Sequence, residues 1–181
     1  SDFDDRLPRN TQWSIETYYR LMLMDILPES VDRLMYLDVD LIINGSIEEL
    51  YHVDFAGDDV IVADDSNGKR TLDTFGSKQI EMFRDMLAQG FRYFNAGVML
   101  FNVAQIRKTH NFNTYMAAIK EWNYEMEAPD QDILNYVHGY KAGYVDYKEF
   151  NLFARIAHNQ KYSYNDVKNS VKIIHFAGDK P

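Results

Sequence analysis

The chain has 181 residues, 46% hydrophobic and 26% charged, which is typical of a single globular domain large enough to bury a substantial core. The formal net charge of -9 argues against nucleic acid or anionic lipid as the main partner, because both attract clustered lysine and arginine. The absence of cysteine excludes disulfides, zinc–thiolate sites and iron–sulfur clusters.

Along the chain, segments with helical periodicity alternate with apolar segments typical of buried strands. The first residues, SDFDDR, are unlike a signal peptide, and no apolar run approaches the roughly 20 residues that a membrane helix needs. The expected elements are a helix over 14–27, a strand over 33–37, a short helix from 46, a strand over 60–63, a helix over 77–87, a strand over 93–101, helices over 113–122 and 130–137, and strands over 143–147 and 171–176. Residues 159–169 are polar enough to be a long surface connection. This order predicts an α/β fold with a mixed sheet covered by helices on both faces.

The stretch LMYLDVDLIING, residues 34–45, places two carboxylates within one of the most apolar runs of the chain. Alternation along a strand would point Asp38 and Asp40 the same way and Val39 the other way. Open α/β sheets bind ligands at the carboxyl ends of their strands, and Mg²⁺ or Mn²⁺ between the two acids would relieve their repulsion. The alternative is that the strand simply ends and both acids are hydrated loop residues.

A second apolar strand, in VKIIHFAGDKP, ends in His175 and is followed by Gly178 and Lys180. Imidazole is a ligand that Mn²⁺ accepts beside carboxylates, and a lysine just beyond could meet a phosphate. His175 would complete a ligand set of two oxygens and one nitrogen. The other histidines have no acidic partner at ligand spacing and are interpreted as surface or packing residues: His52, His110, His138 and His158.

Two further polar groups interrupt the apolar pattern. Asp130, Gln131 and Asp132 occupy the start of a helix, where N-capping explains one acid but not the amide. In YFNAGVMLFN, the run from Asn95 to Gly97 breaks an aromatic and aliphatic strand with an amide and two small residues. Such a gap allows a ligand to approach the backbone closely, although an ordinary bulge would look the same.

Taken together, these segments resemble glycosyltransferase family 8, the retaining nucleotide-sugar transferases that include bacterial lipopolysaccharide galactosyl- and glucosyltransferases. The resemblance covers nearly the whole chain and rests on YYRLML, MYLDVDLIING, YFNAGVMLFN, DQDILN and HFAGDKP, in that order. It implies a GT-A fold, a Rossmann-like α/β domain with a mixed sheet, that binds a UDP-sugar donor and Mn²⁺, or Mg²⁺ in its place. It also implies a glycan acceptor in the synthesis of lipopolysaccharide or another cell-surface polysaccharide.

The resemblance further implies a role for individual residues. The metal ligands would be Asp38, Asp40 and His175. The donor-binding residues would be Arg20, Val39, Asn95, Ala96, Asp130, Gln131, Gly178 and Lys180, with Asp64 as a looser match. For retention at the sugar we favour same-face attack, with Gln131 supporting positive charge at the anomeric carbon. Asp130 is kept as the alternative nucleophile of a double displacement.

Two departures from the family pattern concern the ends. No counterpart of the usual uridine-binding strand and loop precedes Ser1, and the tail has one residue fewer between glycine and lysine. We therefore expect a partial GT-A domain over residues 1–181 that binds donor weakly or not at all by itself. We expect a cytoplasmic location or one at the inner face of the membrane, with any peripheral membrane association in regions that are not present.

Two readings from other classes compete with this one. A haloacid-dehalogenase-like phosphotransferase also uses Asp-x-Asp at a strand end with Mg²⁺, but it would have glycine and threonine where this chain has Leu41 and Ile42. A non-catalytic sugar-binding module would keep Asn95 and Asp130 but would have no use for a metal triad. A glycoside hydrolase is excluded, because its two carboxylates flank a bond and adjacent acids on one strand are too close for that.

Overall fold

The computed structural model describes residues 6–7, 15–65 and 72–178. Its helices are η1 Ile15–Met22, α1 Leu23–Ile26, α2 Glu48–Tyr51, η3 Leu72–Thr74, α3 Ser77–Ala88, α4 Val103–Ile106, α5 Phe112–Glu121, α6 Pro129–His138, η4 Gly139–Lys141, α7 Tyr147–Phe150, α8 Ala154–Asn159 and α9 Tyr164–Ser170. Its strands are β1 Arg33–Leu37, β2 Leu41–Ile43, β3 Val60–Asp64, β4 Phe94–Asn102, β5 Ala142–Val145, β6 Leu152–Phe153 and β7 Ile173–His175. Within these ranges, every helix is too short or too polar to span a bilayer.

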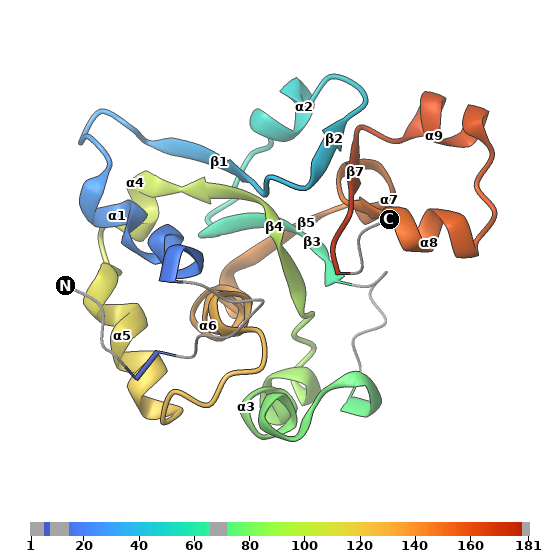
Figure 1. Cartoon of the computed structure of the whole chain (residues 1–181). Coiled ribbons are helices and arrows are strands. Elements are labelled where there is room, and N and C mark those ends of the chain that lie inside the picture. The colour runs from blue at the N-terminus through green and yellow to red at the C-terminus, as the bar shows by residue number, and fades with distance from the viewer. Residues whose placement is uncertain (1–5, 8–14, 66–71, 179–181) are drawn as a thin grey trace.

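The strands form two mixed sheets (Figure 1). The larger sheet has the order β1-β4-β3-β5, in which β4 runs antiparallel to both neighbours and β5 runs parallel to β3. The smaller sheet has the order β2-β7-β6. The β3–β4 register shifts between Val62 and Ala63, opposite Asn95, so the polar interruption of the β4 sequence coincides with a bulge.

The core lies on both faces of the larger sheet because the buried side chains of β4 alternate between two clusters. Met99 and Phe101 belong to the larger cluster, together with buried residues of α3, α5 and α6, whereas Val98 and Leu100 join Leu50 of α2 in the smaller one. Figure 1 shows the first group of helices on one side of the sheet and the smaller sheet with α7, α8 and α9 on the other. The expectation of a mixed sheet covered on both faces is confirmed.

The principal elements lie where the sequence predicted them, but several details differ. The helix expected from 14 begins as the 3-10 helix η1, and Ser14 lies outside the described residues. The capping box expected at Ser46 is not formed: Ile47 is the N-cap of α2, and the Ser46 hydroxyl accepts only the Glu48 amide at 3.3 Å. The surface connection expected over 159–169 includes a helix that was not predicted, because Ser163 caps the exposed helix α9.

Candidate active site

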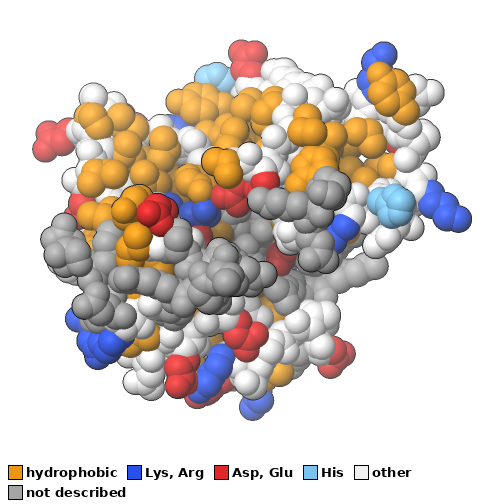
Figure 2. Space-filling model, viewed as in Figure 1, with side chains coloured by type: hydrophobic (Ala, Val, Ile, Leu, Met, Phe, Trp, Pro, Cys, Tyr) orange, Lys and Arg blue, Asp and Glu red, His pale blue; other side chains and the backbone are white. Residues whose placement is uncertain are grey.

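The site is an open cleft of about 510 Å³ at the end of the larger sheet, where β1 and β7 end and α6 begins. Its lining is polar and includes Arg20, Asp38, Asp40, Asp65, Asn95, Asp130, Gln131, Arg155 and His175. In the space-filling view, charged side chains meet in a hollow near the centre of the face (Figure 2). Hydrophobic side chains gather above it over β1 and β2, where Val39, Ile42 and Ile43 are exposed.

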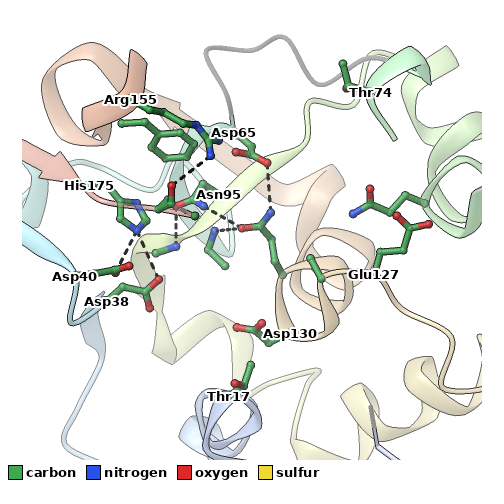
Figure 3. A pocket seen from close by; sticks show the side chains of 18 of the residues that line it. Thr17, Asp38, Asp40, Asp65, Thr74, Asn95, Glu127, Asp130, Arg155 and His175 are labelled. Carbon is green, nitrogen blue, oxygen red and sulfur yellow. Dashed lines mark hydrogen bonds and ion pairs between the residues drawn. The ribbon is translucent and has the colours of Figure 1, made fainter. Parts of the chain in front are cut away.

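Asp38, Asp40 and His175 converge on one side of this cleft (Figure 3). The Nε2 atom of His175 lies 3.4 Å from Asp40 Oδ1 and 3.9 Å from Asp38 Oδ2. One ligand atom from each residue lies within 4.8 Å of the other two. Because β1 ends at Leu37, both acids sit in the turn that leads to β2, and pairing of β2 with β7 brings that turn against His175.

The His175 imidazole is oriented by a buried amide. Its Nδ1 lies 2.8 Å from Asn151 Oδ1, and the Asn151 amide donates to Asn95 Oδ1 at 3.0 Å. An amide oxygen can only accept, so Nδ1 carries the proton and Nε2 presents its lone pair to the two acids. Burial lowers the pKa of His175 although Asp40 and Asp38 oppose this, so the ring is neutral at neutral pH, as a metal ligand must be.

Arg20 links Asp38, in the turn after β1, to the start of α6. Its guanidinium bonds Asp38 Oδ1 at 2.9 Å, Asp130 Oδ2 at 3.0 Å and the carbonyl of Ala96 at 2.8 Å. Burial alone would lower the pKa of Arg20, but Asp130 and Asp38 raise it overall. Burial raises the pKa of Asp130 to about 6 even though the charge of Arg20 opposes this. Asp130 is therefore mostly ionised and paired at neutral pH.

The Gln131 side chain lies on the floor of the cleft and bridges α6 to the bulge of β4. Its Oε1 accepts from Asn95 Nδ2 at 3.0 Å and from the Ala96 amide at 2.9 Å. Its Nε2 donates to the Tyr93 hydroxyl at 3.2 Å and to Asp65 Oδ2 at 3.4 Å. The amide whose presence N-capping left unexplained thus holds the bulged strand against the helix.

Most of the residues expected in the site lie together in the cleft, with three exceptions. Asp64, the looser match for a donor-binding residue, does not line the cleft. Its side chain pairs with Arg92, and the next acid, Asp65, lines the cleft instead. Val39 is fully exposed in the turn between β1 and β2 and does not line the cleft. Lys180 lies outside the described residues, whereas Gly178 lines the cleft with a φ of +85°.

Three residues of the site were missed by reasoning from the sequence. Arg155 lies at the cleft with its guanidinium 5.1 Å from the centre of the Phe153 ring and 3.3 Å from the Ala177 carbonyl. Asp65 and Asn151 are the other two. None has a local signature, because each is placed by contacts between segments far apart in the chain.

The interpretation of the remaining histidines needs one correction. His138 is buried, and its Nδ1 lies 3.1 Å from Asp59 Oδ2, so it does have an acidic partner. Asp59, His110 and His138 form a second group whose ligand atoms lie within 4.8 Å of one another. Sequence spacing concealed the group because its members come from three separate segments.

The donor set of the cleft fits a divalent cation. Two carboxylates and a neutral imidazole are hard and borderline ligands, which suit Mn²⁺ or Mg²⁺ and leave coordination positions for a substrate. The Asn151 bond supplies the outer-shell orientation that metal-bound histidines usually have. Asp38, Asp40 and His175 are therefore the residues that could hold such an ion.

The family model named glycosyl transferase family 8 matches residues 2–181. The chain belongs to this family. Among its relatives, the lipopolysaccharide 1,3-galactosyltransferase of Salmonella typhimurium is 29% identical over 95% of this chain and 50% of the relative. The lipopolysaccharide 1,2-glucosyltransferase of Escherichia coli is 28% identical over the same shares. The chain thus spans about half the length of these curated relatives.

The fold agrees with this membership in family 8. The crystal structure of the galactosyltransferase LgtC, in complex with donor and acceptor sugar analogs, superposes with a TM-score of 0.76 at 25% identity. The match covers 95% of this chain and 62% of that structure. The predicted GT-A fold is confirmed, and the family match argues against the phosphotransferase reading.

Proposed function

We propose that this family 8 chain carries the catalytic site of a retaining glycosyltransferase, which moves a glucose or galactose unit from a UDP-sugar to a saccharide hydroxyl. The observation that carries the proposal is the meeting of Asp38, Asp40 and His175 in a sugar-sized polar cleft. The relatives named as lipopolysaccharide galactosyl- and glucosyltransferases support a hexose donor and a lipopolysaccharide or related cell-surface acceptor. Such a reaction would take place in the cytoplasm or at the inner face of the membrane.

Mn²⁺, or Mg²⁺ in its place, is the proposed cofactor. It would be bound by Asp38, Asp40 and His175, which together form the cleft triad. When bound, such an ion neutralises the diphosphate and stabilises the charge on departing UDP. The protein supplies two arginines to the same region, Arg20 inside the cleft and Arg155 at its mouth. Five acids line the cleft beside them, namely Asp38, Asp40, Asp65, Glu127 and Asp130, so an anionic donor needs the additional positive charge of the metal.

The donor sugar would lie between the bulge of β4 and the start of α6. There the Asn95 and Ala96 region and the Asp130 carboxylate offer hydrogen-bonding groups for sugar hydroxyls. Gly178 and Lys180 would contact the phosphates from the tail. Val39 would contact the donor through its backbone, in the exposed turn between β1 and β2.

For the stereochemical course we favour same-face attack, in which the acceptor hydroxyl passes its proton to the departing phosphate. Gln131 would support positive charge at the anomeric carbon through its carbonyl oxygen, which now accepts from Asn95 and Ala96 and would exchange one of these bonds for the sugar. Asp130 is the less favoured nucleophile because its ion pair with Arg20 withdraws electron density from the carboxylate. A glycosyl adduct trapped on Asp130 would establish the double displacement instead.

The test is Mn²⁺-dependent release of UDP from UDP-glucose and UDP-galactose by the intact parent protein. Asp38→Asn and His175→Ala should each lower the rate at least 100-fold, roughly the effect of losing about 3 kcal/mol of transition-state stabilisation. Asp85→Asn, at an exposed acid of α3, is the matched control and should leave the rate unchanged. Unaltered rates in both triad variants, or turnover of phosphate esters in place of UDP-sugars, would contradict the proposal.

A further inference from the structure

A second cluster of metal-ligating side chains lies away from the cleft, at the opposite end of β3. Asp59 immediately precedes β3, His138 is the last residue of α6, and His110 lies in the connection between α4 and α5. Asp65, which lines the cleft, is six residues beyond Asp59 along the strand. At about 3.3 Å per residue, the two sites are roughly 20 Å apart.

The Asp59 carboxylate is buried with only half of its bonding capacity used. The residue is 1% exposed, and its Oδ2 lies 3.1 Å from His138 Nδ1. Its Oδ1 is buried and has no hydrogen-bond partner in the described part of the chain. Lys141 contributes positive charge nearby but does not bond Oδ1. An unsatisfied carboxylate oxygen in the interior is costly, so this atom points to an additional partner.

Each imidazole of the cluster also lies within hydrogen-bond distance of a hydroxyl group. The Tyr115 hydroxyl lies 2.9 Å from His138 Nε2, and the Thr109 hydroxyl lies 2.7 Å from His110 Nδ1. In the structure His138 Nδ1 donates to the Asp59 carboxylate, which can only accept. A cation placed between them would replace this bond, and the ring protons would then be donated to the Tyr115 and Thr109 hydroxyls, which frees His138 Nδ1 and His110 Nε2 as ligands. This is the outer-shell arrangement that prepares histidine as a metal ligand.

We propose that Asp59, His110 and His138 form a second divalent-metal site, selective for a borderline cation such as Zn²⁺ and independent of glycosyl transfer. The 3.1 Å between Asp59 Oδ2 and His138 Nδ1 is close to the roughly 3.3 Å between two ligands of one tetrahedral zinc. His110, which is only partly buried, approaches from the loop and leaves the fourth position for water. Two nitrogens and one oxygen match zinc better than magnesium or calcium, which prefer oxygen alone.

Such a site would join three segments that meet at this end of the sheet. The backbone of Asp59 already bonds Lys141 after α6 and Asn102 at the end of β4. A metal would add the loop before α5 to this junction. The role that follows is structural, because a cluster roughly 20 Å from the cleft cannot contact a substrate bound there.

The first experiment measures Zn²⁺ stoichiometry on the full chain by competition with a chromophoric chelator. Wild-type protein should bind two equivalents if Zn²⁺ also occupies the cleft, and one when Asp38→Asn, Asp40→Asn and His175→Ala remove the cleft ligands. Adding His110→Gln should weaken the remaining site by more than about 100-fold, beyond the effect of losing an outer-shell partner. His158→Gln, at an exposed histidine of α8, is the matched control and should change nothing.

A second measurement keeps the test decisive if the combined variant folds poorly. In otherwise wild-type protein, His110→Gln should abolish binding of one equivalent of Zn²⁺. Tyr115→Phe removes the hydroxyl but keeps the aromatic ring, and it should weaken binding of the same equivalent about 10- to 100-fold. Bound Co²⁺ should give the intense visible absorption of a tetrahedral site. Equal Zn²⁺ binding by wild type and His110→Gln would overturn the proposal and leave Asp59 and His138 as a buried hydrogen-bonded pair only.

Discussion

At the start of α6, three consecutive side chains serve three different purposes. Asp130 pairs with Arg20 in the cleft, Gln131 bonds the bulge of β4, and Asp132 bonds Tyr93 and Gln79 in the interior. Successive residues of a helix point about 100° apart, so adjacent polar residues cannot share one target. The helix start therefore ties together the cleft, the bulged strand and the core.

Gly97 lies against Asp38 and His175 of the cleft triad. A Cβ at this position would lie 2.7 Å from Asp38 Oδ2 and would collide with the His175 ring. We expect Gly97→Ala to push the carboxylate from the imidazole and to lower Mn²⁺ affinity at least about 10-fold. A titration followed by the electron paramagnetic resonance signal of free Mn²⁺ measures this.

Gly45→Ala is the matched control for that substitution. Its Cβ would lie 2.8 Å from Cδ of Lys172, a flexible side chain that can move aside. Mn²⁺ affinity should not change in this variant. Equal affinities in both glycine variants would show that the close approach at Gly97 does not position the triad.

Arg155 is the exposed cation of the cleft mouth that reasoning from the sequence missed. Its place beside Gly178 and over Phe153 suits a contact with the donor diphosphate. Loss of a charge-assisted hydrogen bond costs about 1.5–3 kcal/mol, so Arg155→Gln should raise the KM for UDP-sugar about 10- to 100-fold. Arg84→Gln, on the exposed face of α3, should leave the KM unchanged, and an equal effect in both would indicate a general electrostatic change only.

The contrast between His175 and Arg155 shows which site residues a sequence reveals. His175 ends an apolar strand and stands out against it, as Asp38 and Asp40 do after β1. Arg155 and Asn151 sit in short segments whose positions depend on the pairing of β6 with β7. A two-residue strand has no periodicity of its own, so its polar neighbours look like ordinary surface residues until the fold is known.

Whether a helix or strand could be predicted from the sequence depends on its length and on what stabilises it. β1, β3 and β4 are apolar runs whose burial determines their state, and they were predicted within a residue or two. β2 is largely exposed and exists because β7 pairs with it. α9 has no buried residue, yet Ser163 and Asp166 form a capping box, a signal that was present in the sequence and was overlooked.

Asp132 is the residue on which the start of α6 depends most. Its Oδ2 accepts the Glu127 and Ala128 amides at 2.9 and 2.8 Å, while Oδ1 accepts from Tyr93 and Gln79. Asp132→Ala would leave several buried donors unpaired, so we expect a loss of about 3 kcal/mol or more in the free energy of unfolding. Urea denaturation followed by circular dichroism measures this loss.

Asp166→Ala is the comparison at an exposed helix start. Asp166 also accepts a backbone amide, that of Ser163 at 2.7 Å, but water can replace this bond. Its removal should change the urea midpoint far less than Asp132→Ala. Similar midpoints for the two variants would mean that the buried network around α6 contributes little to stability.

At the scale of the whole molecule, the two clusters of candidate metal ligands lie at opposite ends of the larger sheet. The cleft triad lies beyond β1 and β7, and the Asp59 cluster lies at the start of β3. The apolar strands predicted the mixed sheet, which the structure confirms. The second cluster escaped because its three members are each unremarkable in sequence and meet only where the residue before β3, the connection between α4 and α5 and the end of α6 come together.

The pH dependence of stability should carry a signature of Asp130. Burial raises its pKa from 3.8 to about 6, so between these values the folded chain binds a proton that the unfolded chain has released. The contribution of this group to stability therefore falls as pH rises through that window, by about 3 kcal/mol at most, and is constant above it.

Asp130→Asn should remove this contribution, so the stability difference between variant and wild type should shift in favour of the variant from pH 4 to pH 7. The ion pair with Arg20 is present only while Asp130 is ionised, so its effect is part of the same titration, and Arg20 itself keeps its charge across this range. Urea unfolding of both proteins at half-unit pH steps measures the difference. A difference that stays flat over this range would show that Asp130 keeps an ordinary pKa and that Arg20 offsets its burial completely.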